Sequence, residues 1–201
     1  MSSDMHGGSP RVLCIAGSPR RSGNSDHLLD ALSRGVQSAG GVPIRIVPAT
    51  AGIAPCRGCN ACSSTGECVI RDAMDEVYPL LDSVDALAVA SPVYFATVPA
   101  VLKALYDRCE PYWARRYVLH EERRPRRRPG ALILVGGGGD PYGTQCAVTP
   151  TKSVFGVLEV EFSEFYEFVG ADSPSDIGRH PEALERAEEI GRALVRRVRE
   201  P

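Results

Sequence analysis

Short apolar runs that end in turn residues recur along this 201-residue chain. The run at Arg11–Ala16 is followed by Gly-Ser-Pro, that at Val84–Ala90 by Ser-Pro, and that at Ala131–Val135 by four glycines. A run that is apolar throughout, and not only at alternate positions, is typical of a strand covered on both faces. The sequence therefore predicts strands at 11–16, 42–47, 84–90, 131–135 and 164–169.

Between these runs, apolar residues recur at helical spacing. Leu28, Leu29, Leu32 and Val36 share one face of a helix that ends at the glycine pair 40–41. Similar patterns predict helices at 24–39, 73–81, 98–109, 145–158 and 181–199. Strands that alternate with helices indicate an α/β fold, a doubly wound parallel sheet of five strands with helices on both faces.

Length and composition limit the possible partners. The chain is 43% hydrophobic with a formal net charge of -2, which is typical of a soluble globular protein and not of a nucleic-acid-binding one. Residues 1–10 are polar and lack the apolar core of a signal peptide, and no apolar stretch is long enough to span a bilayer. We expect a disordered segment at 1–10, a single domain at 11–201, and a cytoplasmic protein without a membrane or nucleic-acid partner.

Four of the seven cysteines fall in one loop at 55–70, as Cys56-x2-Cys59-x2-Cys62-x5-Cys68. Thiolates are soft ligands that select iron-sulfur clusters, zinc or copper, and two-residue spacers let neighbouring sulfurs face one centre. The run opens as ferredoxin-type runs do, which favours a [4Fe-4S] cluster. Two other interpretations stay open: a zinc site, and disulfides or unligated thiols. Zinc is less favoured because it usually takes separated cysteine pairs. Disulfides or unligated thiols are less favoured because the number of cysteines is odd and nothing indicates export.

The loop after the first strand, 17–25, leads directly into a helix, where free backbone N–H groups favour an anion. Arg20 or Arg21 supplies positive charge, and hydroxyl and amide donors come from Ser18, Ser22, Asn24 and Ser25. The triphosphate and dinucleotide glycine motifs are both absent, so a single phosphate on a smaller cofactor fits best. The alternative is a hydrophilic turn in which Asn24 or Ser25 caps the helix.

Ligands of open α/β sheets bind beyond the carboxyl ends of the strands. We therefore expect the loops 17–25, 91–97 and 136–142 to meet at one site. The second loop offers Pro92, Tyr94 and Phe95 as walls for a flat ring, and the third offers bare glycine backbone and Tyr142.

The segment Arg115–Arg128 is rich in arginine and proline. Such a run predicts a solvated loop, and the alternative is a patch that binds an acidic redox partner or a cofactor phosphate. The aromatics and recognition helix of a nucleic-acid module are missing.

Taken together, four motifs resemble the flavodoxin-like iron-sulfur flavoproteins of the NADPH-dependent FMN reductase superfamily. They are GSPRRSGNS at 17–25, CRGCNACSSTGECVIRDAMDEVY at 56–78, SPVYFATVPAVLKALYDR at 91–108 and the glycines at 136–139.

The resemblance implies FMN and a [4Fe-4S] cluster. The FMN phosphate would lie on Ser18, Arg20, Ser22, Asn24 and Ser25. Its ring would lie against Pro92, Val93, Tyr94 and Phe95, with Gly137, Gly138, Asp140 and Tyr142 at the far edge. The cluster would be held by Cys56, Cys59, Cys62 and Cys68, in a homodimer or homotetramer.

This pair of cofactors predicts an oxidoreductase that passes electrons between NAD(P)H or ferredoxin and a small acceptor, such as a quinone, dioxygen, peroxide, nitro or azo compound. No hydrolytic motif is present, and no catalytic residue is assigned. The alternatives are an NAD(P)H-dependent flavin or quinone reductase without a cluster, and a non-catalytic electron carrier or redox sensor.

Overall fold

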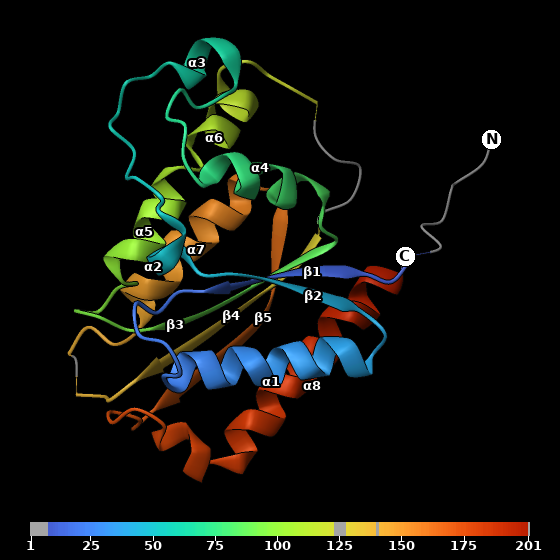
Figure 1. Cartoon of the computed structure of the whole chain (residues 1–201), viewed down its shortest axis with the longest axis vertical. Helices are drawn as coiled ribbons and strands as arrows, with labels where there is room; N and C mark the ends of the chain where they lie inside the picture. Colours follow the sequence, from blue (N-terminus) through green and yellow to red (C-terminus); the bar gives the residue numbers. More distant parts are fainter. Residues whose placement is uncertain (1–7, 123–127, 140, 201) are drawn as a thin grey trace.

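The strands of this protein pair in parallel in a sheet with the order β2-β1-β3-β4-β5 (Figure 1). A computed structural model describes residues 8–122, 128–139 and 141–200. This strand order is that of flavodoxin-like doubly wound folds, so the predicted fold class is confirmed. The strands are β1 Arg11–Ala16, β2 Val42–Ile46, β3 Ala86–Pro92, β4 Arg128–Gly136 and β5 Val160–Val169.

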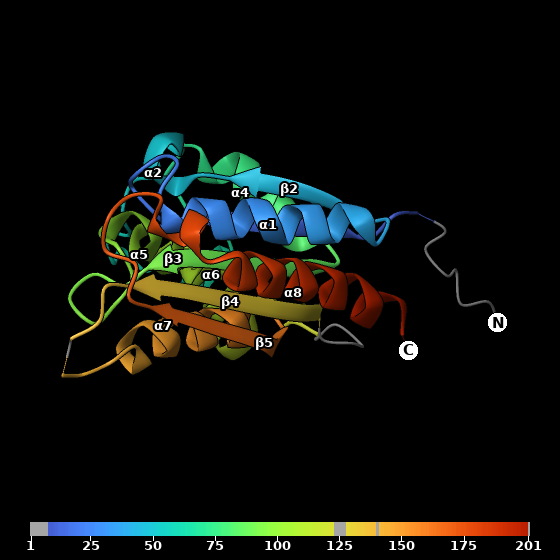
Figure 2. The ribbon, with the colours of Figure 1, turned by 90° about the horizontal axis from the view of Figure 1, so that it is seen from below.

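Helices cover both faces of the sheet (Figure 1 and Figure 2). One face carries α1 Asn24–Ser38 and α8 Pro181–Arg199, and the other carries α4 Met74–Ser83, α5 Ala100–Asp107 and α7 Gln145–Val157. None of the helices in the described ranges has the length and apolar character needed to cross a membrane. The shorter elements, which the sequence did not predict, are α2 Pro48–Ala51, α3 Cys62–Thr65, α6 Glu110–Tyr117 and the 3-10 helix Asp176–Arg179.

The two helical layers explain why the strand sequences are apolar throughout. Side chains alternate along a strand, so Val12 and Cys14 of β1 pack toward α1 and α8, while Leu13 and Ile15 pack toward the opposite layer. All four are at most 2% exposed. The edge strand β5 is different, because partly buried residues alternate with exposed ones along much of it. It begins at Val160, four residues before the predicted start at 164.

The N-terminal segment predicted to be disordered lies mostly outside the described residues, which begin at 8. Within its described part, Pro10 is buried and its carbonyl accepts a hydrogen bond of 2.7 Å from the Val42 N–H. This bond continues the pairing of β1 with β2.

The prediction of a solvated loop at 115–128 is wrong at both ends, and residues 123–127 lie outside the described part. Arg115 belongs to α6, and Arg128 is buried at the start of β4, with only 7% exposed. The Arg128 guanidinium donates to carbonyls at the ends of two helices, Leu81 of α4 and Leu158 after α7. A cation at a helix C-terminus offsets the partial negative charge of the last carbonyls, which is why this arginine is stable inside.

Two glycines bring α1 and α8 into backbone contact. A Cβ at Gly35 would lie 2.0 Å from the carbonyl oxygen of Glu188, and one at Gly191 would lie 2.1 Å from that of Leu32. Both distances are far below any real carbon–oxygen contact, so a side chain at either position forces the helices apart.

Replacing Gly35 by Ala should lower the free energy of unfolding by about 1–3 kcal/mol, the usual range for an overpacked core. Denaturant unfolding of the full chain measures this. The matched control is Gly156→Ala in α7, where a Cβ meets nothing within 4 Å. There we expect no loss of stability, and an equal loss in both variants would contradict the close contact of α1 with α8.

Candidate cofactor sites

The loops that follow β1, β3 and β4 line one cleft of about 480 Å³. It lies at the carboxyl ends of β1 and β3, where the strand order reverses and where open α/β sheets bind ligands. The structure therefore brings these three loops together as predicted. The predicted residues that line it are Ser18, Arg20, Asn24, Ser25, Pro92, Val93, Tyr94, Phe95 and Gly137.

Four predicted residues are not placed in this lining. Ser22, Gly138 and Tyr142 belong to the same loops but are not part of the wall, and Asp140 lies outside the described residues. The Ser22 N–H donates instead to the Asp26 carboxylate at 2.9 Å.

The loop after β5 contributes Ala171 and Asp172 to the cleft, which the sequence analysis missed. A Cβ at Gly137 would lie 2.2 Å from Oδ1 of Asp172, so the loops after β4 and β5 lie in close contact there. The predicted fifth strand could have indicated these residues, because parallel strands all end at the same edge of the sheet and the loop after β5 must lie there too. Gly23, Val135 and Gly136 complete the wall.

The N-terminus of α1 opens toward this cleft without a side-chain cap. The N-cap residue is Gly23, so the predicted capping by Asn24 or Ser25 is wrong. The Asn24 amide instead fastens the loop after β5, donating to the Ser173 carbonyl at 2.9 Å and accepting from the Ile177 N–H at 3.1 Å. The first backbone N–H groups of a helix lack intrahelical partners, so those of α1 are available to an anion.

A strained turn holds two aromatic rings at the edge of the cleft. Tyr94 and Thr97 exchange backbone hydrogen bonds of 2.8 and 3.0 Å, and between them Phe95 and Ala96 have φ values of 48° and 61°. Positive φ at both central residues is the type I′ geometry, which is rare for residues as bulky as phenylalanine. The Phe95 side chain is fully exposed and that of Tyr94 is 39% exposed.

The four cysteines of the predicted cluster line a second cavity, of about 310 Å³. The loop that carries these cysteines connects α2 with α4 and lies at the top of Figure 1, around α3. The rest of the cavity wall comes from Asp107, Arg108, Glu110 and Pro111, and no described residue lines both the cavity and the cleft. All four are free thiols, from the exposed Cys56 and Cys59 to the buried Cys62. In the described ranges, no three His, Cys, Asp or Glu side chains are already gathered tightly enough for a single metal ion.

Left-handed residues turn the cysteine loop back on itself. Gly58, Asn60 and Gly66 have φ values of 65°, 57° and 71°. The Gly66 carbonyl accepts a hydrogen bond of 2.8 Å from Nε of Arg115 in α6. An arginine from the supposedly solvated segment thus supports the cysteine loop.

The thiols of this cavity have unequal acidity. Hydrogen bonds, first from the Ala61 backbone and then from the Arg57 side chain, hold the pKa of Cys59 below its ordinary value. Burial raises the pKa of Cys62, and the Glu110 carboxylate and the neighbouring Cys68 and Cys56 raise it further. Negative groups that face one another in this way are stabilised when a positive centre binds between them.

Solved structures share this architecture. A flavone reductase has a TM-score of 0.70 at 15% identity, covering 94% of this chain and 63% of that one. An NAD(P)H:quinone oxidoreductase from Methanothermobacter marburgensis has a TM-score of 0.66 at 20% identity, covering 92% and 97%. An archaeal flavodoxin covers 94% and 99% with a TM-score of 0.56 at 13% identity. Such likeness defines the class of fold alone, a flavodoxin-like α/β protein.

Sequence comparisons identify the family. Residues 10–162 match the family of NADPH-dependent FMN reductases. An iron-sulfur flavoprotein from Archaeoglobus fulgidus is 30% identical over 92% of this chain and 79% of its own length. Another, from Methanosarcina thermophila, is 33% identical over 63% of each chain. The chain belongs to the iron-sulfur flavoproteins of the NADPH-dependent FMN reductase superfamily, as its motifs predicted.

Proposed function

We propose that this protein is an FMN-dependent oxidoreductase of the iron-sulfur flavoprotein type. It takes electrons from NAD(P)H or ferredoxin and delivers them to a small acceptor, using FMN in the strand-end cleft and a [4Fe-4S] cluster in the cysteine cavity. The observation that carries the proposal is the presence of both cavities in one chain, one at the switch point of the sheet and one walled by four free thiols. Membership of the family supports it.

The strand-end cleft suits FMN in size and chemistry. Its volume of about 480 Å³ is typical of cofactor pockets. One end has the open N-terminus of α1 with Arg20 and the buried hydroxyls of Ser18 and Ser25, a set of groups that binds a phosphate. The other end has the aromatic turn at 94–95, which suits the flat ring. The Asp172 and Gly137 contact closes the wall between the loops after β4 and β5.

The cysteine cavity suits a cluster better than a single zinc ion. Zinc draws four thiolates to about 2.3 Å from one point, whereas this cavity has a volume of about 310 Å³. Four thiolates are the ligand set of a [4Fe-4S] cluster, and none of the histidines in the described ranges lines the wall. The positive irons would stabilise the Cys62 thiolate, whose pKa is raised first by burial and then by the Glu110 carboxylate and the neighbouring thiols.

The two groups supply complementary chemistry when bound, because a flavin exchanges one or two electrons and a cluster exchanges one. The tasks of the chain are to orient the flavin ring and to hold the cluster through its thiolates. We propose that the protein works in the cytoplasm, as a homodimer or homotetramer, in which a cluster and a flavin of different subunits can approach.

Replacing Arg20 by Gln should weaken FMN binding roughly tenfold to a hundredfold, because a charge-assisted hydrogen bond contributes about 1.5–3 kcal/mol. Riboflavin, which has no phosphate, should bind both proteins alike. Fluorescence titration of the flavin-free chain measures the two affinities.

The matched control is Arg21→Gln, since Arg21 is exposed and does not line the cleft. We expect its FMN affinity to stay within about twofold, well below the effect of one charged hydrogen bond. Equal effects of the two substitutions would contradict the assigned phosphate site.

Replacing Cys59 by Ala should remove the iron and acid-labile sulfide from anaerobically purified protein and leave FMN bound, because the two cavities share no residue. The control is Cys146→Ala, which removes another exposed thiol outside the cysteine cavity and should keep both cofactors. Loss of flavin together with iron in Cys59→Ala would contradict separate sites. Zinc without sulfide in the unmodified protein would contradict the cluster.

A further inference from the structure

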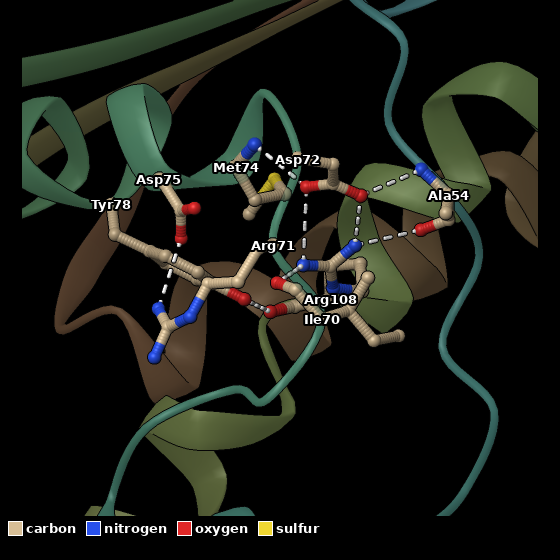
Figure 3. Close-up of polar contacts among 8 residues, drawn as sticks. All are labelled: Ala54, Ile70, Arg71, Asp72, Met74, Asp75, Tyr78 and Arg108. Carbon is tan, nitrogen blue, oxygen red and sulfur yellow. Dashed lines mark hydrogen bonds and ion pairs between the residues drawn. The ribbon is translucent and has the colours of Figure 1, made fainter.

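Arg108, the residue that follows α5, holds both ends of the cysteine loop. Nη1 of Arg108 donates to the Ala54 carbonyl at 2.9 Å, and Nη2 donates to the Ile70 carbonyl at 3.0 Å (Figure 3). Ala54 lies just before Cys56, and Ile70 lies just after Cys68. A single guanidinium therefore closes the segment that contains all four thiols.

Asp72 completes the contact from the other side. Its carboxylate accepts two hydrogen bonds from Arg108, of 2.6 and 3.2 Å, in the bidentate arrangement shown in Figure 3. The same carboxylate accepts the Ala54 N–H and the Met74 N–H, each at 2.9 Å. The two side chains and these backbone groups form one connected network, which we call the Arg108–Asp72 clasp.

The clasp is anchored in the folded core. The Arg108 side chain is fully buried and that of Asp72 is 12% exposed. The Arg108 carbonyl accepts a hydrogen bond of 2.8 Å from the Tyr78 hydroxyl, which ties the end of α5 to α4. Burial raises the pKa of Asp72, but the hydrogen bonds from Arg108, Met74 and Ala54 outweigh it and hold that pKa below its ordinary value. The pair is therefore ionised at neutral pH.

The loop between the two ends has little other support from regular structure. Residues 57–60 are exposed, and its one helix, α3, has four residues. Ordering such a loop around a cluster has a large entropic cost if its ends are free. When the ends are fixed beforehand, much of that cost is met by the folding of the protein and not by the binding of the cluster.

Arg108 also lies in the wall of the cysteine cavity, together with the four cysteines. Its Nε–H group is buried and has no hydrogen-bond partner in the described part of the chain. A buried cation with a donor to spare is suited to a wall around several thiolates, because it offsets their negative charge.

We propose that the Arg108–Asp72 clasp is a positioning device for the cysteine loop, which holds the four thiols ready for the cluster and slows the loss of the cluster once bound. Asp72 and Arg108 act through the loop ends and are not ligands. The inference rests on the proposed cluster function, and its test separates the two.

The test compares two clasp variants with two neighbours. Asp72→Asn keeps the size of the side chain but removes its charge, and Arg108→Lys keeps the charge but loses the fork that reaches three partners at once. The matched controls are Asp75→Asn and Arg71→Lys, which make the same two substitutions in an exposed ion pair of 3.2 Å beside the same loop. Each full-length protein is purified anaerobically, and the rate of iron loss to a chelator, the FMN affinity and the exchange of the Ala54 and Met74 amide protons are measured.

Both clasp variants should lose iron and exchange the Ala54 amide at least about tenfold faster than the unmodified protein, as expected for hydrogen bonds to charged groups. FMN affinity should stay within about twofold in every variant, because the clasp lies outside the flavin cleft, and both controls should stay within about twofold throughout. The proposal would be overturned if the clasp variants lost iron at the rate of the unmodified protein. It would also be overturned if Arg108→Lys alone behaved like the unmodified protein, because charge without the fork would then be sufficient. A general loss of folding would lower FMN affinity as well, and is recognised by that.

The unmodified protein gives a reading that needs no variant. After removal of iron, its Ala54 and Met74 amides should still exchange at least about tenfold more slowly than those of the exposed residues 57–60, because hydrogen bonds to a carboxylate protect them. Equal exchange would overturn the clasp even if the protein holds a cluster. Slow exchange in a protein that never contained iron would support the closed loop and overturn the proposed cluster instead.

Discussion

All the strands of a parallel sheet end at the same edge, and this geometric constraint creates the strand-end cleft. Loops that are far apart in the sequence, after β1, β3, β4 and β5, meet there because the strands that carry them are paired in register. The constraint depends in turn on the two helical layers, which keep every central strand buried on both faces. The backbone contact of α1 with α8 is one of the places where that packing has no room to relax.

The cysteine cavity follows a different logic. It does not lie at a strand end but in the long connection between β2 and β3, which holds α2, α3 and α4. Such a loop has no ladder of hydrogen bonds to hold its shape, so its geometry depends on side chains from other elements. Arg108 after α5 and Arg115 in α6 provide this support, by donating to backbone carbonyls of the loop. The strand-end cleft is thus built by the sheet, whereas the cysteine cavity belongs to one of its connections and is held in place by arginines.

The sequence predicted what depends on local pattern. Uniformly apolar runs identified β1 and β3, helical spacing identified α1 and α8, and cysteine spacing identified the residues of the second cavity. The edge strand β5 was placed less well because its polar residues hide its start. Asp172 was missed because its loop carries no motif, only a position after the fifth strand.

Three arginines show that a charged residue in the sequence does not always predict an exposed side chain in the fold. Arg115 and Arg128 were predicted on a solvated loop because nothing in the local sequence shows that backbone carbonyls distant in the chain lie ready to accept from them. The motif after β3 predicted no role for Arg108. Within the described ranges it is the largest fully buried side chain, and it connects the end of α5 with the cysteine loop. Partners that are non-local in sequence are visible only once the fold is known.

The central claim is that one chain carries two redox groups at two separate sites. Quantifying iron, acid-labile sulfide and FMN in the unmodified protein, purified without oxygen, tests it most directly. The account predicts about four iron, about four sulfide and about one FMN for each chain, as a single [4Fe-4S] cluster and a single flavin require. Flavin without iron and sulfide would contradict the cluster site, and protein that binds neither group would contradict the account as a whole.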